Sequence, residues 1–207
     1  ISKLKKLFLL GPSRSGKTTL EKLLSNSPNV LPLYESTKDI PKIIENNSQA
    51  PLKIENIFYQ NDEFSLADEY EIVTSTSPET LFHIDALMDR LANSYCVLMK
   101  RDRVEIASEM FRTEYSNGNF YSYNHSWIMD YLDAYEAVWQ NIIHKLPNRC
   151  LEISFENLLT NPDSVCREIG ELTRVDLNSN TIENVSTRMS TTPYRKLYEQ
   201  KFVKSPS

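Results

Sequence analysis

The sequence predicts an α/β fold in which a mostly parallel sheet of about five strands carries helices on both of its faces. Short apolar runs alternate with segments of helical periodicity along the chain, an alternation typical of parallel strands joined by helices. The run 94–100 is apolar almost throughout, as expected for a central strand that is buried on both faces. A chain of 207 residues can bury a sizeable core, and we expect residues 1–207 to form a single domain.

The N-terminal part of the chain supplies the first predicted strands and the first predicted helix. Residues 5–10 are a hydrophobic run that ends at a glycine, and leucines at helical spacing follow within 18–24. Residues 29–36 and 71–74 are further extended segments. The polar stretch that follows residue 36 is interrupted by prolines, and its pattern predicts no regular structure.

Helices and strands continue to alternate through the second half of the chain. Pro78 stands where a first helical turn tolerates proline, and an apolar helix face follows it. The longest helical pattern stops before Pro147, because proline cannot continue a helix. The predicted helices are 78–91, 103–115, 125–146 and 161–172, and the predicted strands are 94–100 and 149–154.

Composition excludes several classes of partner. Lysine and arginine number 23 against 28 aspartates and glutamates, and the net charge of -5 argues against a nucleic-acid-binding face. Cys96, Cys150 and Cys166 show no metal-ligand spacing, so we expect reduced, structural cysteines and no metal site. No apolar run approaches the ~20 residues of a membrane span, and we expect no such span and a cytoplasmic location.

A glycine loop carries the clearest chemical signal. Residues 11–18, GPSRSGKT, match the pattern G-x-x-x-x-G-K-[ST] between a predicted strand and a predicted helix. Backbone N–H groups and the positive end of the helix dipole enclose an anion in such a loop, while Lys17 adds a charge and Thr18 and Thr19 add hydroxyls. The sequence therefore predicts a P-loop-type three-layer fold that binds a phosphorylated ligand.

The loop alone would predict an ATP-dependent kinase of a small molecule. Such an enzyme needs Mg²⁺, which is usually held by the loop Ser or Thr and by an acidic residue at the end of a neighbouring strand. The buried strand here ends CVLMKRDR, so Asp102 lies between Arg101 and Arg103. This basic end suits a second anion better than a metal ion.

Four segments of the chain follow one another in a distinctive order. They are GPSRSGKTTLEKLLSNSPNV, then STSPETLFHIDALMDRLANSYCVLMKRDRVEIASEMFR, then GNFYSY with YLDAYEAVW and LPNRCLEISFENLLTNPDSVCREI, and last STRMSTTPYRKLYEQ. Together they resemble the sulfotransferase family that uses 3'-phosphoadenosine 5'-phosphosulfate as donor. The pattern is most similar to the bacterial TPR-associated and tyrosylprotein branches.

The resemblance implies a set of donor-binding residues. The loop that holds the 5'-phosphosulfate would consist of Arg14, Ser15, Gly16, Lys17, Thr18 and Thr19. The arginine for the 3'-phosphate would be Arg101, because a guanidinium can take two phosphate oxygens at once. We assign its serine partner to Ser108, although the family spacing falls on Glu109. In the C-terminal segment, Ser190 and Lys196 match the tail serine and lysine, and the serine would lie near the transferred group.

The resemblance also implies a catalytic base. Counting without gaps from Arg14 places the family's glutamate at Glu35, which would take the proton of the acceptor hydroxyl. Arg14, Lys17 and the loop amides would stabilise the sulfuryl group during transfer. The family usually has Thr at the position of Lys17, and it often has Lys at the position of Thr76. In our interpretation, the positive charge near the sulfuryl group has therefore moved from one loop to the other.

We therefore expect an enzyme that moves a sulfuryl group in line from the donor to an acceptor hydroxyl and releases adenosine 3',5'-bisphosphate. The acceptor hydroxyl could belong to a glycan, a tyrosine-containing peptide or a small metabolite. A non-enzymatic nucleotide-binding protein and the kinase are the alternatives. Aromatic residues within 119–127 are candidates for the acceptor cleft, although such spacing is also typical of packing.

Overall fold

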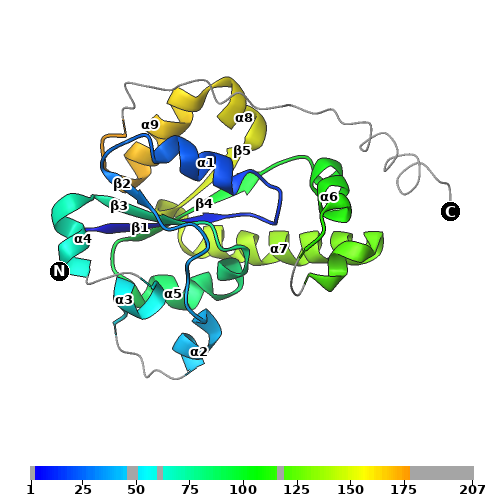
Figure 1. The fold of residues 1–207 in the computed structure, drawn as a ribbon, viewed down its shortest axis with the longest axis horizontal. Helices are drawn as coiled ribbons and strands as arrows, with labels where there is room; N and C mark the ends of the chain where they lie inside the picture. Colours follow the sequence, from blue (N-terminus) through cyan, green and yellow to red (C-terminus); the bar gives the residue numbers. More distant parts are fainter. Residues whose placement is uncertain (1–2, 46–50, 60–62, 116–118, 178–207) are drawn as a thin grey trace.

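The computed structural model describes residues 3–45, 51–59, 63–115 and 119–177. These residues form three layers, with a central sheet and helices on each side of it (Figure 1). The segment STRMSTTPYRKLYEQ, with the predicted site residues Ser190 and Lys196, lies outside the described residues.

The sheet has five strands, and all of their pairings are parallel. Its strands are β1 (Lys5–Leu10), β2 (Val30–Pro32), β3 (Ile72–Ser75), β4 (Ser94–Lys100) and β5 (Cys150–Ser154), in the spatial order β2-β3-β1-β4-β5. Phe8 in the central strand is in register with Ser75 on one side and Cys96 on the other. The prediction of a mostly parallel sheet of about five strands is confirmed.

Helices cover both faces of the sheet, as the sequence predicts. One face carries α1 (Lys17–Leu24), α8 (Phe155–Thr160) and α9 (Pro162–Thr173) (Figure 1). The other face carries α2 (Ile40–Glu45), α3 (Ile54–Ile57), α5 (Ile84–Arg90) and α7 (His125–Lys145). The remaining elements are α4 (Glu63–Glu69), α6 (Arg103–Arg112), and the 3-10 helices η1 (Pro78–His83), η2 (Phe120–Tyr123) and η3 (Pro147–Arg149).

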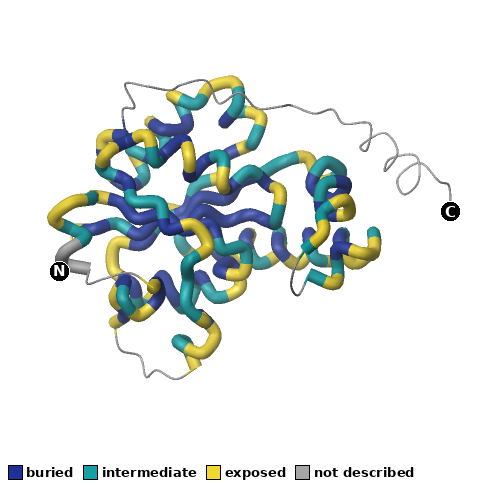
Figure 2. Tube along the Cα trace, viewed as in Figure 1, coloured by how far each residue is buried: buried dark blue, intermediate teal, exposed yellow. Residues whose placement is uncertain are grey.

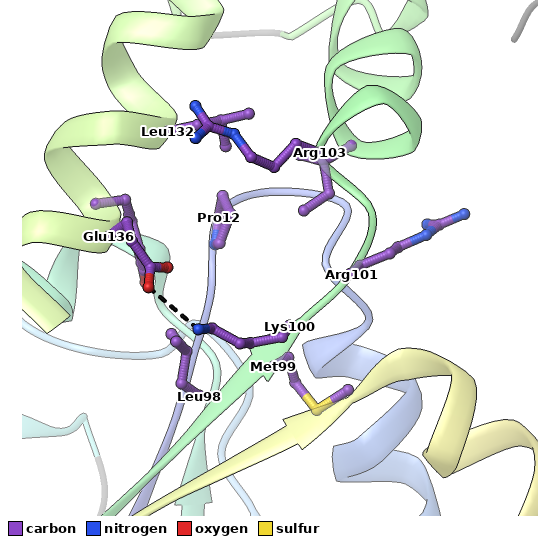
Figure 3. A pocket seen from close by; sticks show the side chains of 10 residues that line it. Pro12, Leu98, Met99, Lys100, Arg101, Arg103, Leu132 and Glu136 are labelled. Atoms are coloured by element: carbon purple, nitrogen blue, oxygen red, sulfur yellow. Dashed lines mark hydrogen bonds and ion pairs between the residues drawn. The ribbon is translucent and has the colours of Figure 1, made fainter. Parts of the chain in front are cut away.

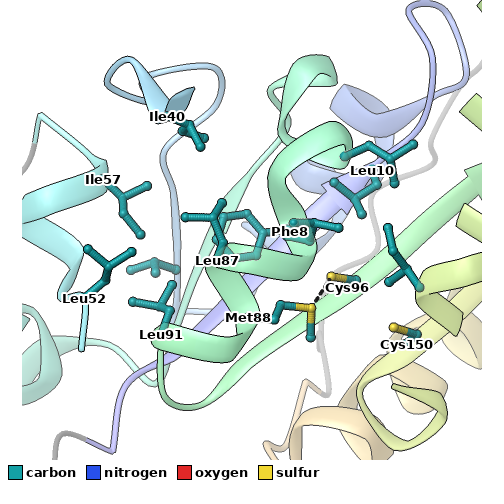
Figure 4. Packing of buried hydrophobic residues seen from close by; sticks show 14 of the residues in the cluster. Phe8, Leu10, Ile40, Leu52, Ile57, Leu87, Met88, Leu91, Cys96 and Cys150 are labelled. Carbon is teal, nitrogen blue, oxygen red and sulfur yellow. Dashed lines mark hydrogen bonds between the residues drawn. The ribbon is translucent and has the colours of Figure 1, made fainter. Parts of the chain in front are cut away.

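Two apolar layers hold these helices to the sheet. Figure 2 shows that the strands are the most deeply buried part of the chain. Leu20, Leu158 and Val165 pack from α1, α8 and α9 against one face. The core on the other face is shown in Figure 4, where Leu87 lies beside Phe8. All three cysteines are free and buried, as expected.

The local pattern missed several short elements. The predicted helix 78–91 is a 3-10 turn that becomes α-helical at Ile84, and the predicted helix 103–115 ends at Arg112. Helices α2, α3, α4 and α8 were not predicted, because helices of four to seven residues contain too few turns for a periodic pattern. Packing of residues such as Ile54 and Leu158 into the core stabilises α3 and α8 instead.

This topology places a crevice at the carboxyl end of the sheet. The central strand β1 leads into α1 on one face, while its neighbours β3 and β4 lead into η1 and α6. In parallel sheets, ligands bind outside the carboxyl ends of strands at such a change of direction. None of the helices in the described ranges combines the length and apolar character that a membrane crossing requires.

Candidate functional site

The glycine loop between β1 and α1 adopts a backbone conformation that favours glycine at two positions. Gly11 has a φ of 148° and Gly16 a φ of 105°, both in the region that favours glycine. A Cβ atom on Gly11 would overlap the Ser15 side chain, and one on Gly16 would overlap the Phe155 ring. The loop therefore packs too closely for larger residues at these positions.

A buried tyrosine from α7 fixes the start of the loop. The backbone N–H of Gly11 donates to the Tyr135 hydroxyl at 2.7 Å, and that hydroxyl donates in turn to the Pro78 carbonyl at 3.3 Å. Burial raises the pKa of Tyr135, so its hydroxyl stays protonated and can accept one bond while donating the other. The phenol thus joins the loop to η1.

Residues after α6 hold the middle of the loop. The Nε of Arg14 donates to the Thr113 hydroxyl at 3.1 Å, and the Tyr115 hydroxyl donates to the Ser13 hydroxyl at 3.0 Å. Arg14 itself is in the left-handed region, with a φ of 67°. These contacts stabilise an uncommon backbone conformation at the point where the loop turns.

Lys17 is buried at the first turn of α1. Its ammonium donates to the carbonyl oxygens of Gly11 and Pro12 at 2.7 and 2.9 Å, and the residue is only 5% exposed. Burial lowers its pKa from the ordinary 10.5 to about 8, although the carboxylate of Glu35 acts in the opposite direction. At neutral pH the side chain therefore still carries a positive charge toward the loop.

A pocket of about 440 Å³ opens over this loop, and we call it the loop pocket. It brings together loop residues, the turn after β2, the start of η1, the end of β4 and the starts of α1 and α8. Its lining residues are Ser13, Arg14, Gly16, Lys17, Thr18, Thr19, Glu35, Pro78, Arg101, Glu109 and Phe155. Most site residues predicted within the described ranges therefore line one pocket, whereas Ser15 and Ser108 are not among its lining residues.

The Arg101 side chain is held in place on three sides. Its Nε donates to the Glu105 carboxylate at 3.1 Å, and its Nη1 donates to the carbonyl oxygen of Arg14 at 2.9 Å. Its guanidinium carbon lies 4.6 Å from the centre of the Phe155 ring. Such contacts orient a guanidinium before a ligand arrives.

Comparison with known families assigns the chain to one of them. A model of the sulfotransferase family matches residues 56–179, which is more than half of the chain. The chain belongs to the sulfotransferase family. The resemblance deduced from the four segments is thus confirmed.

A curated relative of this chain is distant in sequence. An uncharacterized protein of Aquifex aeolicus (strain VF5) is 20% identical over 205 residues, a match that covers 88% of this chain and 27% of the relative. The chain therefore spans only about a quarter of the length of that curated relative.

Solved sulfotransferase structures share the fold. Sulfotransferase STF1 from Mycobacterium tuberculosis H37Rv superposes with a TM-score of 0.59 at 12% identity, covering 96% of this chain and 71% of its own. The sulfotransferase domain of the Synechococcus PCC 7002 olefin synthase gives 0.59 at 11% identity, with 99% and 96% covered. A sulfotransferase from Alicyclobacillus acidocaldarius gives 0.55 at 17% identity, with 93% and 88% covered.

The turn that carries Glu35 is anchored to the sheet through its neighbour Tyr34. The N–H of Tyr34 donates to Glu21 at 3.2 Å, and its carbonyl accepts from the Thr76 N–H at 3.0 Å and from the Ser75 hydroxyl at 3.2 Å. Tyr34 has a φ of 51°, so these bonds hold a turn conformation that tyrosine rarely adopts. Glu35 itself is exposed and reaches the loop pocket.

The acceptor of the Tyr34 bond is an unusual buried carboxylate. Glu21 on α1 is 0% exposed, and it accepts a second hydrogen bond from the Thr74 hydroxyl at 2.6 Å. Burial raises the pKa of Glu21, while the bonds from Thr74 and Tyr34 lower it. Glu21 therefore joins helix, sheet and turn directly beneath Glu35.

Ser108 and Glu109, the two α6 residues considered for the 3'-phosphate, have different surroundings. The Ser108 hydroxyl donates to the carbonyl of Glu105 at 2.9 Å, and the residue is largely buried. Glu109 lines the loop pocket and pairs with Arg112. Ser108 therefore stays a prediction as the 3'-phosphate serine, whereas the neighbour at the family spacing faces the pocket.

A second pocket, the Lys100 pocket, lies on the other side of the loop beside α6 and α7 (Figure 3). It has a volume of about 280 Å³. The Lys100 ammonium lies 3.1 Å from a carboxylate oxygen of Glu136 and 3.1 Å from one of Glu152. Figure 3 shows Arg101 pointing away from this ion pair. The charge of Lys100 is thus already compensated by two carboxylates.

Several site residues were not found from the sequence. Phe155 lines the loop pocket, and Tyr135 and Glu21 hold its walls. Phe155 directly follows β5, and the carboxyl ends of parallel strands meet at one edge of the sheet. This position could therefore have marked Phe155 as a candidate site residue. Tyr135 and Glu21 offered no such signal, because their partners are far away in the sequence. In the described ranges, no three His, Cys, Asp or Glu side chains gather as metal ligands would.

Proposed function

We propose that this chain transfers a sulfuryl group from 3'-phosphoadenosine 5'-phosphosulfate to an acceptor hydroxyl, with Glu35 as the general base. The observation that carries the proposal is the composition of the loop pocket, where the anion-binding loop, Arg101 and Glu35 share one lining. The end of the neighbouring strand β4 offers the arginine Arg101 to this pocket, rather than the acidic residue that usually helps to hold Mg²⁺ in a P-loop kinase. The family membership supports the same reaction class.

The residues of the pocket fit the donor. The loop amides with Arg14, Lys17, Thr18 and Thr19 would hold the 5'-phosphosulfate, as helix N-termini with adjacent cations hold anions. Ser15 supports this assignment, because its buried hydroxyl has no hydrogen-bond partner in the described part of the chain. Arg101 would bind the 3'-phosphate. Ser108, Ser190 and Lys196 belong to the proposal through the family resemblance.

Transfer would occur in line at sulfur. The acceptor oxygen forms a bond to sulfur while the bond from sulfur to the bridging phosphate oxygen breaks, and its electron pair leaves with adenosine 3',5'-bisphosphate. Glu35 accepts the proton of the acceptor hydroxyl. Arg14 and Lys17 stabilise the charge that develops on the leaving oxygens, as in phosphoryl transfer.

A calorimetric titration separates the candidate functions. The sulfotransferase proposal expects tight binding of adenosine 3',5'-bisphosphate without Mg²⁺ and its loss in Arg101→Ala. A kinase would bind ATP only with Mg²⁺ and would be indifferent to Arg101. A non-enzymatic binding protein would bind the bisphosphate but transfer no labelled sulfate, and Glu35→Ala would change nothing.

A further inference from the structure

A third pocket is lined by the chain segments that adjoin Glu35 and Pro78, and we call it the Thr80 pocket. It has a volume of about 350 Å³, within the range of roughly 300 to 1,000 Å³ that small-molecule pockets occupy. Its walls are residues 37–41, which follow Glu35, and residues of 77–83, which surround Pro78. Glu35 and Pro78 line the loop pocket, so the same two chain segments border both pockets.

One wall residue has an unsatisfied polar group. Thr80 is 1% exposed, and its hydroxyl has no hydrogen-bond partner among the described residues. Its backbone N–H donates to the Ser77 carbonyl at 3.3 Å in the first turn of η1. Buried hydroxyls are nearly always hydrogen-bonded, because desolvation without a partner costs free energy. A ligand hydroxyl in the pocket would supply the missing partner.

The charges of the pocket limit what that ligand can be. The Lys38 ammonium donates to the carbonyl of Glu55 at 2.6 Å and lies 5.7 Å from the Tyr59 ring centre, so its charge is directed to the protein itself. The Asp39 carboxylate pairs with Lys42 at 2.8 Å. Glu79 adds a further carboxylate to the lining. His83 is the remaining ionisable residue of the lining. An anionic ligand would therefore meet two carboxylates, while the lysine of the lining is directed to the protein itself.

The remaining lining groups suit a molecule with several hydroxyls. Thr37, Ser77 and Thr80 can each donate and accept a hydrogen bond, and Glu79 accepts from hydroxyl groups. Ile40 and Pro41 are the apolar residues of the lining and the other lining residues are polar or charged, so the pocket favours a polar acceptor over a lipid.

We propose that the Thr80 pocket is the acceptor subsite and that the acceptor is a neutral, polyhydroxylated molecule of carbohydrate type. This inference rests on the proposed function. One acceptor hydroxyl reaches Glu35, loses its proton to that carboxylate and takes the sulfuryl group from the donor in the loop pocket. The other hydroxyls bond to Thr80 and its neighbours and fix the acceptor.

The test uses labelled-sulfate transfer from the donor to three probes: maltotriose, p-nitrophenol and an acidic tyrosine-containing peptide. We expect transfer to maltotriose above the other two. Thr80→Val keeps the side-chain shape but removes the hydroxyl, and we expect it to raise the KM for maltotriose roughly tenfold. Its melting temperature should not fall, because the removed hydroxyl has no partner among the described residues.

Matched variants separate the possible results. Ser77→Ala should also raise the KM for maltotriose, while Thr160→Val, on the exposed side of α8, should not. Transfer only to p-nitrophenol or the peptide, or to none of the probes while adenosine 3',5'-bisphosphate binds, would overturn the inference and leave the donor site standing. An unchanged KM in Thr80→Val would do the same. Failure of the bisphosphate to bind would instead refute the proposed function.

Discussion

Arg101 donates a hydrogen bond from its guanidinium to the backbone carbonyl of Arg14 at 2.9 Å. This bond joins the end of β4 to the glycine loop, although the two residues are 87 positions apart in the sequence. Because Glu105 and Phe155 hold the other sides of the guanidinium, the spacing between the two proposed anion sites is set by the protein. The two sites thus form a clamp whose geometry exists without the donor.

The first prediction concerns this clamp. Arg101→Ala should weaken binding of adenosine 3',5'-bisphosphate by at least about tenfold, since a hydrogen bond to a charged group contributes about 1.5 to 3 kcal/mol. Calorimetric titration measures the dissociation constant. Arg103→Ala is the control, because Arg103 pairs with Asp133 and does not line the loop pocket. Equal affinities in the two variants would refute the role of Arg101.

The second prediction is a pH dependence of donor binding. Lys17 has a pKa of about 8, so it loses its positive charge in the free protein as the pH rises above that value. Binding of adenosine 3',5'-bisphosphate should weaken between about pH 8 and 10 and be accompanied by proton uptake. In Lys17→Thr this dependence should be absent, while Lys22→Thr, exposed on the same helix, should retain it. Identical pH profiles in Lys17→Thr and wild type would contradict this reading.

The third prediction concerns stability and the same lysine. The folded-state pKa of Lys17 lies below the ordinary 10.5, so the unfolded chain binds more protons between about pH 8 and 10.5. The free energy of unfolding should therefore rise with pH across this window, by up to about 3 kcal/mol from this group. Urea unfolding of wild type and Lys17→Thr over this range measures the contribution as their difference. If the difference in the free energy of unfolding between the two proteins does not change with pH, this contribution of Lys17 is excluded.

The fourth prediction tests the base. Glu35→Gln removes the proton acceptor but keeps the size of the side chain, so kcat should fall by roughly 10²- to 10⁴-fold. The dissociation constant of adenosine 3',5'-bisphosphate should change little. Labelled-sulfate transfer provides kcat, and Glu156→Gln on the exposed side of α8 serves as the control. If kcat survives in Glu35→Gln, another group accepts the proton.

The fifth prediction concerns the support beneath the base. Glu21→Leu leaves the Tyr34 N–H and the Thr74 hydroxyl without their acceptor, so the protein should lose about 2 to 4 kcal/mol of stability. The turn that carries Glu35 should loosen, and kcat should fall more than the KM changes. Glu21→Gln keeps an acceptor oxygen and should restore most of both losses. If Gln fails to rescue kcat while it rescues the melting temperature, Glu21 does not act by positioning the turn.

Much of the fold and part of the site could be read from local patterns. All five strands were predicted within a few residues, except that the segment 29–36 shortens to Val30–Pro32 because Tyr34 turns the chain. Arg14, Lys17, Glu35 and Arg101 were placed by motif spacing, and the structure gathers them in one pocket. Short helices such as α2 and α3 were missed, because packing against the core stabilises them and they are too short to show a periodic sequence pattern.

The sequence by itself determined the alternation of strands and helices, the glycine loop and the family. These features depend on neighbours within a few residues, whose spacing is visible in one dimension. The three-dimensional structure was needed to show that Tyr135 holds Gly11 and that Phe155 supports Arg101. It was also needed to show that the Thr80 hydroxyl, which has no partner among the described residues, borders a pocket near the proposed base. Such contacts join segments far apart in the chain, and their distances depend on how the sheet and its helices pack.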